Sequence, residues 1–180
     1  MNKNQRRKNM KTQKRLLTWI LVAVLVVTAL ALVACVDKPR PVQLTELKLP
    51  ELKDNQMAVI IKNGDNDYTS YVVTLGTGGT DATTAEGVIQ YLHDEADLTV
   101  NWTDSEFGKY LHGIGGISED TANSAYVIVF TSVVKDQGTY AGVTTYDVGD
   151  VTIVEAGVGI SSMTVEAGAV IYFEIVSYAF

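Results

Sequence analysis

TTAEGVIQYLHDEA (residues 83–96) decides the fold, because it is the one stretch after residue 56 whose apolar spacing predicts a helix. Thr83 or Thr84 can cap it, and Thr83 and Glu86 have the spacing of a capping box. The polar side chains fall opposite one apolar face, which is typical of a helix packed on a core. That face consists of Val88, Ile89, Leu92 and Ala96.

The sequence on both sides of this helix is typical of β-structure. Before it, two β-rich runs, 57–61 and 68–75, flank Asn63-Gly64, a dipeptide that favours a tight hairpin turn. After it, β-branched and aromatic residues predict further strands. The longest run, 126–134, is continuously apolar, as in a strand buried on both faces. The other strands are expected near 98–102, 143–146, 151–154 and 170–176, with a glycine-broken segment at 110–117.

This order of a hairpin, one helix and several strands predicts an α+β fold. We expect a mixed sheet with the single helix packed on one face. A β-grasp-like arrangement satisfies that order. The region after residue 56 holds no proline and has a length that suits one domain, 57–180.

Three segments of this region together resemble the transcobalamin-like C-terminal domain of bacterial surface proteins. They are the Thr-initiated helix, an Ile-Gly-Gly-Ile element before an aromatic-led strand (114–117 and 126–130), and a Gly-Val-Gly-Ile-Ser-Ser-Met segment (157–163) before the last strand. Tyr126 stands where the family usually has Trp, and Gly168-Ala169 where it has Gly-Asp. The resemblance implies a β-grasp-like fold and a non-enzymatic binding role. The vitamin carriers also use a helical domain, so cobalamin binding does not carry over by itself.

The N-terminus predicts export and membrane attachment. Seven cations and no acid precede an apolar run, 16–33, which is the order of a signal peptide. The run ends in Leu32-Val33-Ala34-Cys35, which resembles the lipobox of bacterial lipoproteins and holds the only cysteine of the chain. The resemblance implies cleavage after Ala34 and acylation of Cys35. An uncleaved transmembrane anchor is the alternative, since about 20 apolar residues span a bilayer.

These observations divide the chain into a lipoprotein signal peptide (1–34), a lipidated N-terminus with an extended tether (35–56), and the domain. All three prolines, Pro39, Pro41 and Pro50, fall in the tether. Residues 35–180 carry 7 basic and 21 acidic residues, a net charge of −14. A nucleic-acid partner is excluded by this charge, because phosphate binding needs clustered Lys and Arg. We expect the domain on the outer face of the cytoplasmic membrane of a bacterium, with lipidated Cys35 as its membrane contact.

No segment carries a strong catalytic or metal-binding motif. His93 and His112 lack enough partners for a zinc site, and Asp65-Asn66-Asp67 lacks the later ligands of a calcium loop. The glycine-rich stretch 76–79 has no following Lys-Ser/Thr, so phosphate binding is not expected. Ser105, Ser161 and Ser162 lie outside any Gly-x-Ser-x-Gly motif, although a triad assembled only in space stays open.

The sequence therefore predicts a membrane-anchored binding module that is not an enzyme and has no resident cofactor or metal. Its ligand would be a small molecule, such as a corrinoid of the cobalamin type. The alternative is a protein-interaction or adaptor module that docks to a surface protein or transporter. A deep apolar pocket would favour the first and an unpaired edge strand the second. A small hydrolase would need Ser or Asp within hydrogen-bond reach of His93 or His112.

Overall fold

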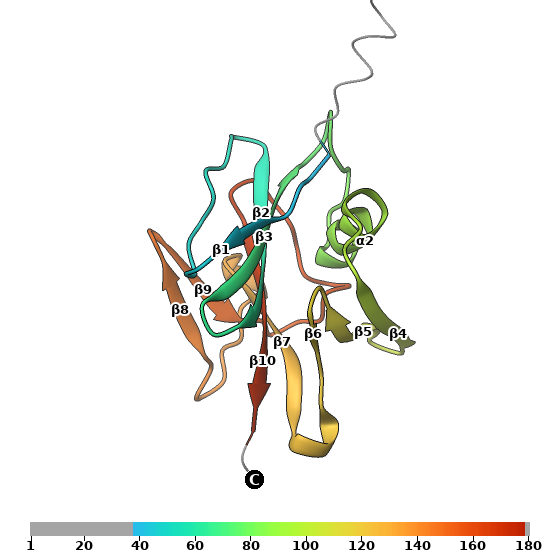
Figure 1. Ribbon diagram of the computed structural model, residues 1–180, viewed down its shortest axis with the longest axis vertical. Helices are drawn as coiled ribbons and strands as arrows, with labels where there is room; N and C mark the ends of the chain where they lie inside the picture. Colours follow the sequence, from blue (N-terminus) through green and yellow to red (C-terminus); the bar gives the residue numbers. More distant parts are fainter. Residues whose placement is uncertain (1–37, 179–180) are drawn as a thin grey trace, which may run out of the picture. The chain divides into compact units, whose positions relative to one another are not determined.

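The computed structural model describes residues 38–178 (Figure 1). Leu32, Val33, Ala34 and Cys35 therefore lie outside the described residues. The elements are β1 (Val42–Leu44), β2 (Gln56–Gly64), β3 (Asp67–Thr74), α2 (Ala85–Ala96), β4 (Val100–Ser105), β5 (Gly108–Ile114), β6 (Ile117–Ser118), η1 (Thr121–Asn123), β7 (Ala125–Thr131), η2 (Val134–Asp136), β8 (Thr145–Val148), β9 (Val151–Glu155) and β10 (Val170–Ser177).

The strands form two sheets, and the α+β prediction is confirmed. The larger sheet has seven strands in the order β1-β3-β2-β10-β7-β9-β8, and the smaller has the order β4-β5-β6. β10 pairs with β2 in parallel, while the other pairs of the larger sheet are antiparallel, so the sheet is mixed. Figure 1 shows α2 and the smaller sheet on one side of β2 and β10, with β8 and β9 on the other.

β2 and β10 are continuous apolar runs because both of their faces are buried. Along β2, Met57, Val59 and Ile61 belong to one core cluster, whereas Ala58 and Ile60 belong to the other. β10 alternates in the same way, with Ile171 and Phe173 in the first core and Val170 and Tyr172 in the second. The larger sheet thus separates two cores, one on each of its faces.

The first core lies under α2, as its apolar face predicts. Val88, Ile89 and Leu92 are fully buried. Thr84 is the N-cap residue, and its hydroxyl accepts a hydrogen bond from the Gly87 amide at 3.3 Å. A capping box that begins at Thr84 would need Glu or Gln at position 87, where the chain has Gly87. The Thr83–Glu86 spacing is therefore not used as a capping box. Asp97 ends the helix in the left-handed region, with φ 54°.

The second core is covered partly by the segment expected to be a tether. Leu47, Leu49 and Leu52 pack against it, and β1 pairs with β3, with Val42 opposite Ser70. The structure therefore differs from a free tether over 42–52, and the folded region begins before residue 57. The physical reason is that these leucines cover an apolar face that would otherwise meet water.

Two local expectations are corrected. The run 126–134 is a strand only to Thr131, since Val134–Asp136 form η2, and its residues 126–129 are only half-buried. In the β2–β3 hairpin the left-handed residue is Asn66, with φ 56°, rather than Gly64. The pairing continues past Asn63 to Gly64 opposite Asp67, with a bulge after Lys62. The turn therefore consists of Asp65 and Asn66.

Candidate functional site

Three strand ends meet at one end of the larger sheet. β7 ends beside the start of β10, because the two strands are antiparallel with Thr131 opposite Ile171. Ser132 closes this junction: its amide donates to the Val170 carbonyl at 3.0 Å, and its hydroxyl accepts from the Val170 amide at 2.9 Å. β9 begins at the same end, since it runs antiparallel to β7 with Val154 opposite Thr131. The loops around these ends form the walls of a cleft.

A buried carboxylate fixes these loops to one another. Asp136, in η2, is only 7% exposed. Its carboxylate accepts a hydrogen bond from the Thr164 amide at 2.6 Å, and its backbone carbonyl accepts from the Gly157 amide at 2.9 Å. The next residue, Gln137, donates from its side chain to the Thr131 carbonyl at 3.1 Å. The hydrogen bonds of Asp136 therefore tie the loop after β7 to the loop after β9.

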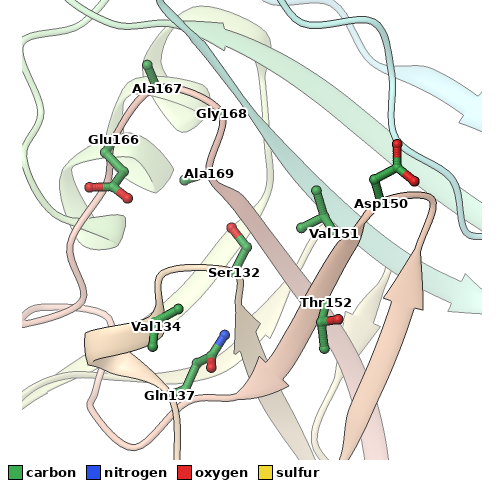
Figure 2. A pocket seen from close by; sticks show the side chains of 10 residues that line it. All are labelled: Ser132, Val134, Gln137, Asp150, Val151, Thr152, Glu166, Ala167, Gly168 and Ala169. Carbon is green, nitrogen blue, oxygen red and sulfur yellow. The ribbon is translucent and has the colours of Figure 1, made fainter.

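The first cavity of this end has a volume of about 460 Å³, and half of its lining residues have polar side chains (Figure 2). Figure 2 shows the carboxylates of Glu166 and Asp150 on opposite sides of the cavity, with Ser132 between them. Gln137 and Thr152 add an amide and a hydroxyl. The cavity volume lies in the range of about 300–1,000 Å³ that is usual for small-molecule sites.

A second cavity of about 520 Å³ adjoins the first, because Gln137 lines both. Its other lining residues include Lys135, Thr139 and Tyr140. Burial of the hydroxyl is the main reason that the pKa of Tyr140 is raised to about 12, and its hydrogen bond to Glu155 adds to the increase. Tyr140 is therefore a neutral hydrogen-bonding group with a half-exposed ring at neutral pH. We call the two cavities together the loop-end cleft.

The loop-end cleft is open and of mixed polarity rather than deep and apolar. Two carboxylates of exposed residues, Asp150 and Glu166, lie at the edges of the first cavity, and no Lys, Arg or His is among its lining residues. Uncompensated carboxylates attract cations and disfavour anions. Its hydroxyl and amide groups can donate to and accept from a polyhydroxylated or amine-bearing ligand. A large apolar ring system finds little matching surface there.

A second polar cluster lies on the outer side of the smaller sheet. His112, on β5, is bound on both ring nitrogens: Nδ1 lies 2.6 Å from a carboxylate oxygen of Glu119, and Nε2 lies 3.0 Å from the hydroxyl of Thr103 on β4. The other carboxylate oxygen of Glu119 accepts from the hydroxyl of Tyr110 at 2.9 Å. The Tyr110 ring meets the His112 ring edge to face, with centroids 4.8 Å apart. We call these four residues the β5 cluster.

Hydrogen bonds set the protonation of this cluster. The hydrogen bond from His112 lowers the pKa of Glu119, against a smaller effect of burial, and the bond from Tyr110 lowers it further. Burial raises the pKa of Tyr110, and its hydrogen bond to Glu119 adds to the increase. Glu119 is therefore an ionised acceptor, and Tyr110 a neutral donor, over the neutral range.

Thr103, His112 and Glu119 have the order of nucleophile, base and orienting acid in a hydrolytic triad. Catalysis also needs a place about 3 Å from the nucleophile and from oxyanion donors, where a substrate carbonyl can lie. None of the three residues lines either cavity. Thr103 is also fixed in the ladder opposite Tyr110 in an exposed strand. The geometry is that of a cross-strand polar contact, and neither of the two cavities reaches it.

The other candidates from the sequence have structural partners. His93 Nδ1 lies 2.8 Å from the Leu98 carbonyl, just after α2. Ser161 accepts from the Lys109 amide at 2.8 Å, and the Ser105 hydroxyl donates to the Gly108 carbonyl at 2.6 Å. Among residues 38–178 no group of three or more His, Cys, Asp or Glu side chains could hold a metal ion. No helix in this range is long and apolar enough to cross a membrane.

Sequence reasoning missed the loop-end cleft. Its polar residues come from separate loops, so no spacing along the chain connects Ser132 with Asp150 or Glu166. The one available signal is their position relative to the strands. Ser132 directly follows β7, Asp150 directly precedes β9, and Glu166 lies in the loop before β10. That signal becomes informative only once the strand order is known.

Comparison with known proteins gives a fold-level likeness alone. Neither a protein-family model nor a curated protein sequence matches the chain. A crystal structure of a proposed metal-binding protein from Ruminococcus gnavus matches with a TM-score of 0.48 and 11% sequence identity, over 69% of this chain and 99% of that one.

Proposed function

We propose that the chain is an extracytoplasmic lipoprotein whose folded region is a non-catalytic binding module. Acylated Cys35 holds it at the outer face of a bacterial cytoplasmic membrane. A β-grasp-like organisation supports this proposal, since the first long strand, β2, and the last, β10, lie side by side in parallel at the centre of the sheet, with α2 between them in the chain. That organisation exposes loops for binding at one end of a rigid sheet.

The loop-end cleft is the observation that carries the binding role. It is of ligand size, its walls are fixed by Asp136, and its first cavity offers Asp150 and Glu166 without a cationic side chain in the lining. Such a cavity suits a hydrophilic ligand with amine or hydroxyl groups. A corrinoid is larger than either cavity and would contact only part of its own surface there. Corrinoid binding is therefore the weaker version of the proposal.

Titration calorimetry on the full chain in detergent micelles tests the cleft. Spermidine, a neutral disaccharide, cobinamide and cobalamin are the probes. We expect heat with spermidine or the disaccharide, and at least a tenfold loss of affinity in the double variant Asp150→Asn, Glu166→Gln. Glu106→Gln, at an exposed acid of the β4–β5 turn, is the matched control and retains affinity. Absence of heat with all four probes at millimolar concentration contradicts the cleft as a binding site.

The second candidate function is a protein adaptor, and the smaller sheet favours it. Within residues 38–178, β4 pairs only with β5, so its other edge offers backbone groups to an incoming strand. Phe107, at the end of the β4–β5 hairpin, is 83% exposed. An exposed aromatic beside an open edge can anchor a surface protein or transporter. Photo-crosslinking from the exposed neighbouring position 106 in intact cells distinguishes this function, because a specific crosslinked band that Phe107→Ala removes supports an adaptor.

A further inference from the structure

The start of the folded region and the loop-end cleft lie at the same end of the larger sheet. β1 runs antiparallel to β3, which runs antiparallel to β2, so β1 has the direction of β2 and of its parallel neighbour β10. The chain therefore enters β1 from the end at which β2 and β10 begin. Glu166, Ala167, Gly168 and Ala169, which line the first cavity, come directly before β10.

The chain is in contact with the folded region almost as soon as it leaves Cys35. The Lys38 ammonium lies 2.9 Å from a carboxylate oxygen of Glu95 on α2, and Pro39 is buried. The hydrogen bond and charge of Glu95 raise the pKa of Lys38, which stays a cation. From Val42 the backbone is held in β1, where the Gln43 side chain also bonds the Thr69 hydroxyl at 3.1 Å.

Covalent length then limits how far the folded region can move from its anchor. Two residues, Val36 and Asp37, separate Cys35 from Lys38. Three extended steps reach at most about 11 Å, and the seven steps to Val42 reach about 25 Å. A free tether over 36–56, as the prolines suggested, would have let the folded region move far from its anchor, whereas this spacing keeps Lys38 within about 11 Å of Cys35.

We infer that the end of the sheet bearing the loop-end cleft is held against the bilayer surface, so that the cleft is filled from the membrane side. The partner of this end is the outer leaflet itself. This inference rests on the proposed acylation of Cys35. The opposite end, with the β2–β3 turn at Asp65 and Asn66, points away into the surrounding medium. β10 is eight residues long, so the two ends lie about 25 Å apart.

Two single-cysteine variants of the full chain test the orientation, because Cys35 is the only native cysteine and acylation blocks its thiol. Ala167→Cys labels the cleft end, and Asp65→Cys labels the opposite end; both residues are exposed. Each acylated variant carries a fluorophore on its introduced cysteine. It is anchored in the outer leaflet of phosphatidylcholine vesicles that also contain a lipid with a nitroxide headgroup. We expect at least threefold stronger quenching at position 167 than at position 65.

A linker variant supplies the matched control. Twelve Gly/Ser residues inserted between Val36 and Asp37 leave the fold and the acylation unchanged but free the orientation, so the two positions become equally quenched. Equal quenching without the insert, in protein whose acylation mass spectrometry confirms, overturns the inference and leaves the lipoprotein proposal standing. Protein without acyl mass on Cys35 overturns both.

Discussion

Tyr146 and Glu174 lie 28 positions apart in the chain, yet the hydroxyl of Tyr146 on β8 donates to the carboxylate of Glu174 on β10 at 2.5 Å. The same carboxylate accepts from the Tyr172 hydroxyl at 3.0 Å and from the Lys62 ammonium at 3.2 Å. Glu174 is 3% exposed, so these contacts replace its lost hydration. The cluster joins the outermost strand of the sheet to its centre.

Removing the cation of this cluster leaves a buried negative charge with only hydroxyl donors. We expect Lys62→Met to lower the free energy of unfolding by about 1–3 kcal/mol, because charge-assisted contacts to buried groups carry costs of that size. Urea unfolding followed by circular dichroism measures it. Lys62→Met combined with Glu174→Gln should recover part of the loss. A double variant no more stable than Lys62→Met contradicts the role of the charge.

Burial raises the pKa of Tyr172 and of Tyr146, and in both the neighbouring Glu174 raises it further. Above about pH 10 these tyrosines ionise in the unfolded chain, whereas in the folded state they stay neutral to a higher pH. Their stabilising effect is therefore complete below about pH 10 and is lost as the pH rises above it. We expect the melting temperature to fall steeply above that pH. Tyr172→Phe should flatten the fall. Equal alkaline slopes in the unchanged protein and in Tyr172→Phe count against this explanation.

The lowered pKa of Glu119 gives the opposite dependence. Its bonds with His112 and Tyr110 stabilise the fold above the ordinary carboxyl pKa, and this contribution is lost as the pH falls from about 4.5 through the lower folded-state pKa. Glu119→Gln should lower stability at pH 7 by about 0.5–1.5 kcal/mol, with a smaller difference at pH 3. Chemical denaturation at the two pH values measures both. Glu106→Gln is the exposed control, and a Glu119→Gln effect independent of pH rules out the ionised carboxylate as its source.

Asp136 should be the residue on which the loop-end cleft depends structurally. Asp136→Ala removes the acceptor of the Thr164 amide, and we expect a loss of about 1–3 kcal/mol because that amide is left without its partner. Hydrogen exchange should accelerate selectively in the loops at 132–140 and 157–165. Asp81→Ala, at an exposed aspartate before α2, is the control. Unchanged exchange in both loops means that Asp136 does not hold them.

Substitution of a leucine in 42–52 tests whether this segment covers the second core or is a free tether. Leu49→Ala should lower the free energy of unfolding by about 1 kcal/mol, less than the 2–5 kcal/mol of a fully buried leucine because Leu49 is half-buried. Lys48→Ala, at the exposed neighbouring side chain, should leave stability unchanged. Denaturant midpoints of the two variants give the comparison, and identical midpoints favour a free tether.

The helix and the strands were predictable where local sequence decides them. Val88, Ile89 and Leu92 follow a helical period, and β2 and β10 are rich in β-branched residues, so their existence follows from the sequence. The strand order does not, because the pairing of Ala58 with Val170 depends on closure of a long loop. The role of Leu49 was hidden by its proline-bearing neighbours. The cleft residues Ser132 and Asp150 come to the same end of the sheet only through the pairing of β7 with β9.

The pairing of β2 with β10 has a consequence for biogenesis. Lys62 and Glu174, which the two strands bring together, are 112 positions apart, so the centre of the sheet is completed only after the last strand leaves the ribosome. Folds closed by such distant contacts form slowly. If the chain is exported as proposed above, this late closure would leave the polypeptide unfolded while a translocation machinery threads it. The order of strands would then keep the chain competent for export until it has crossed.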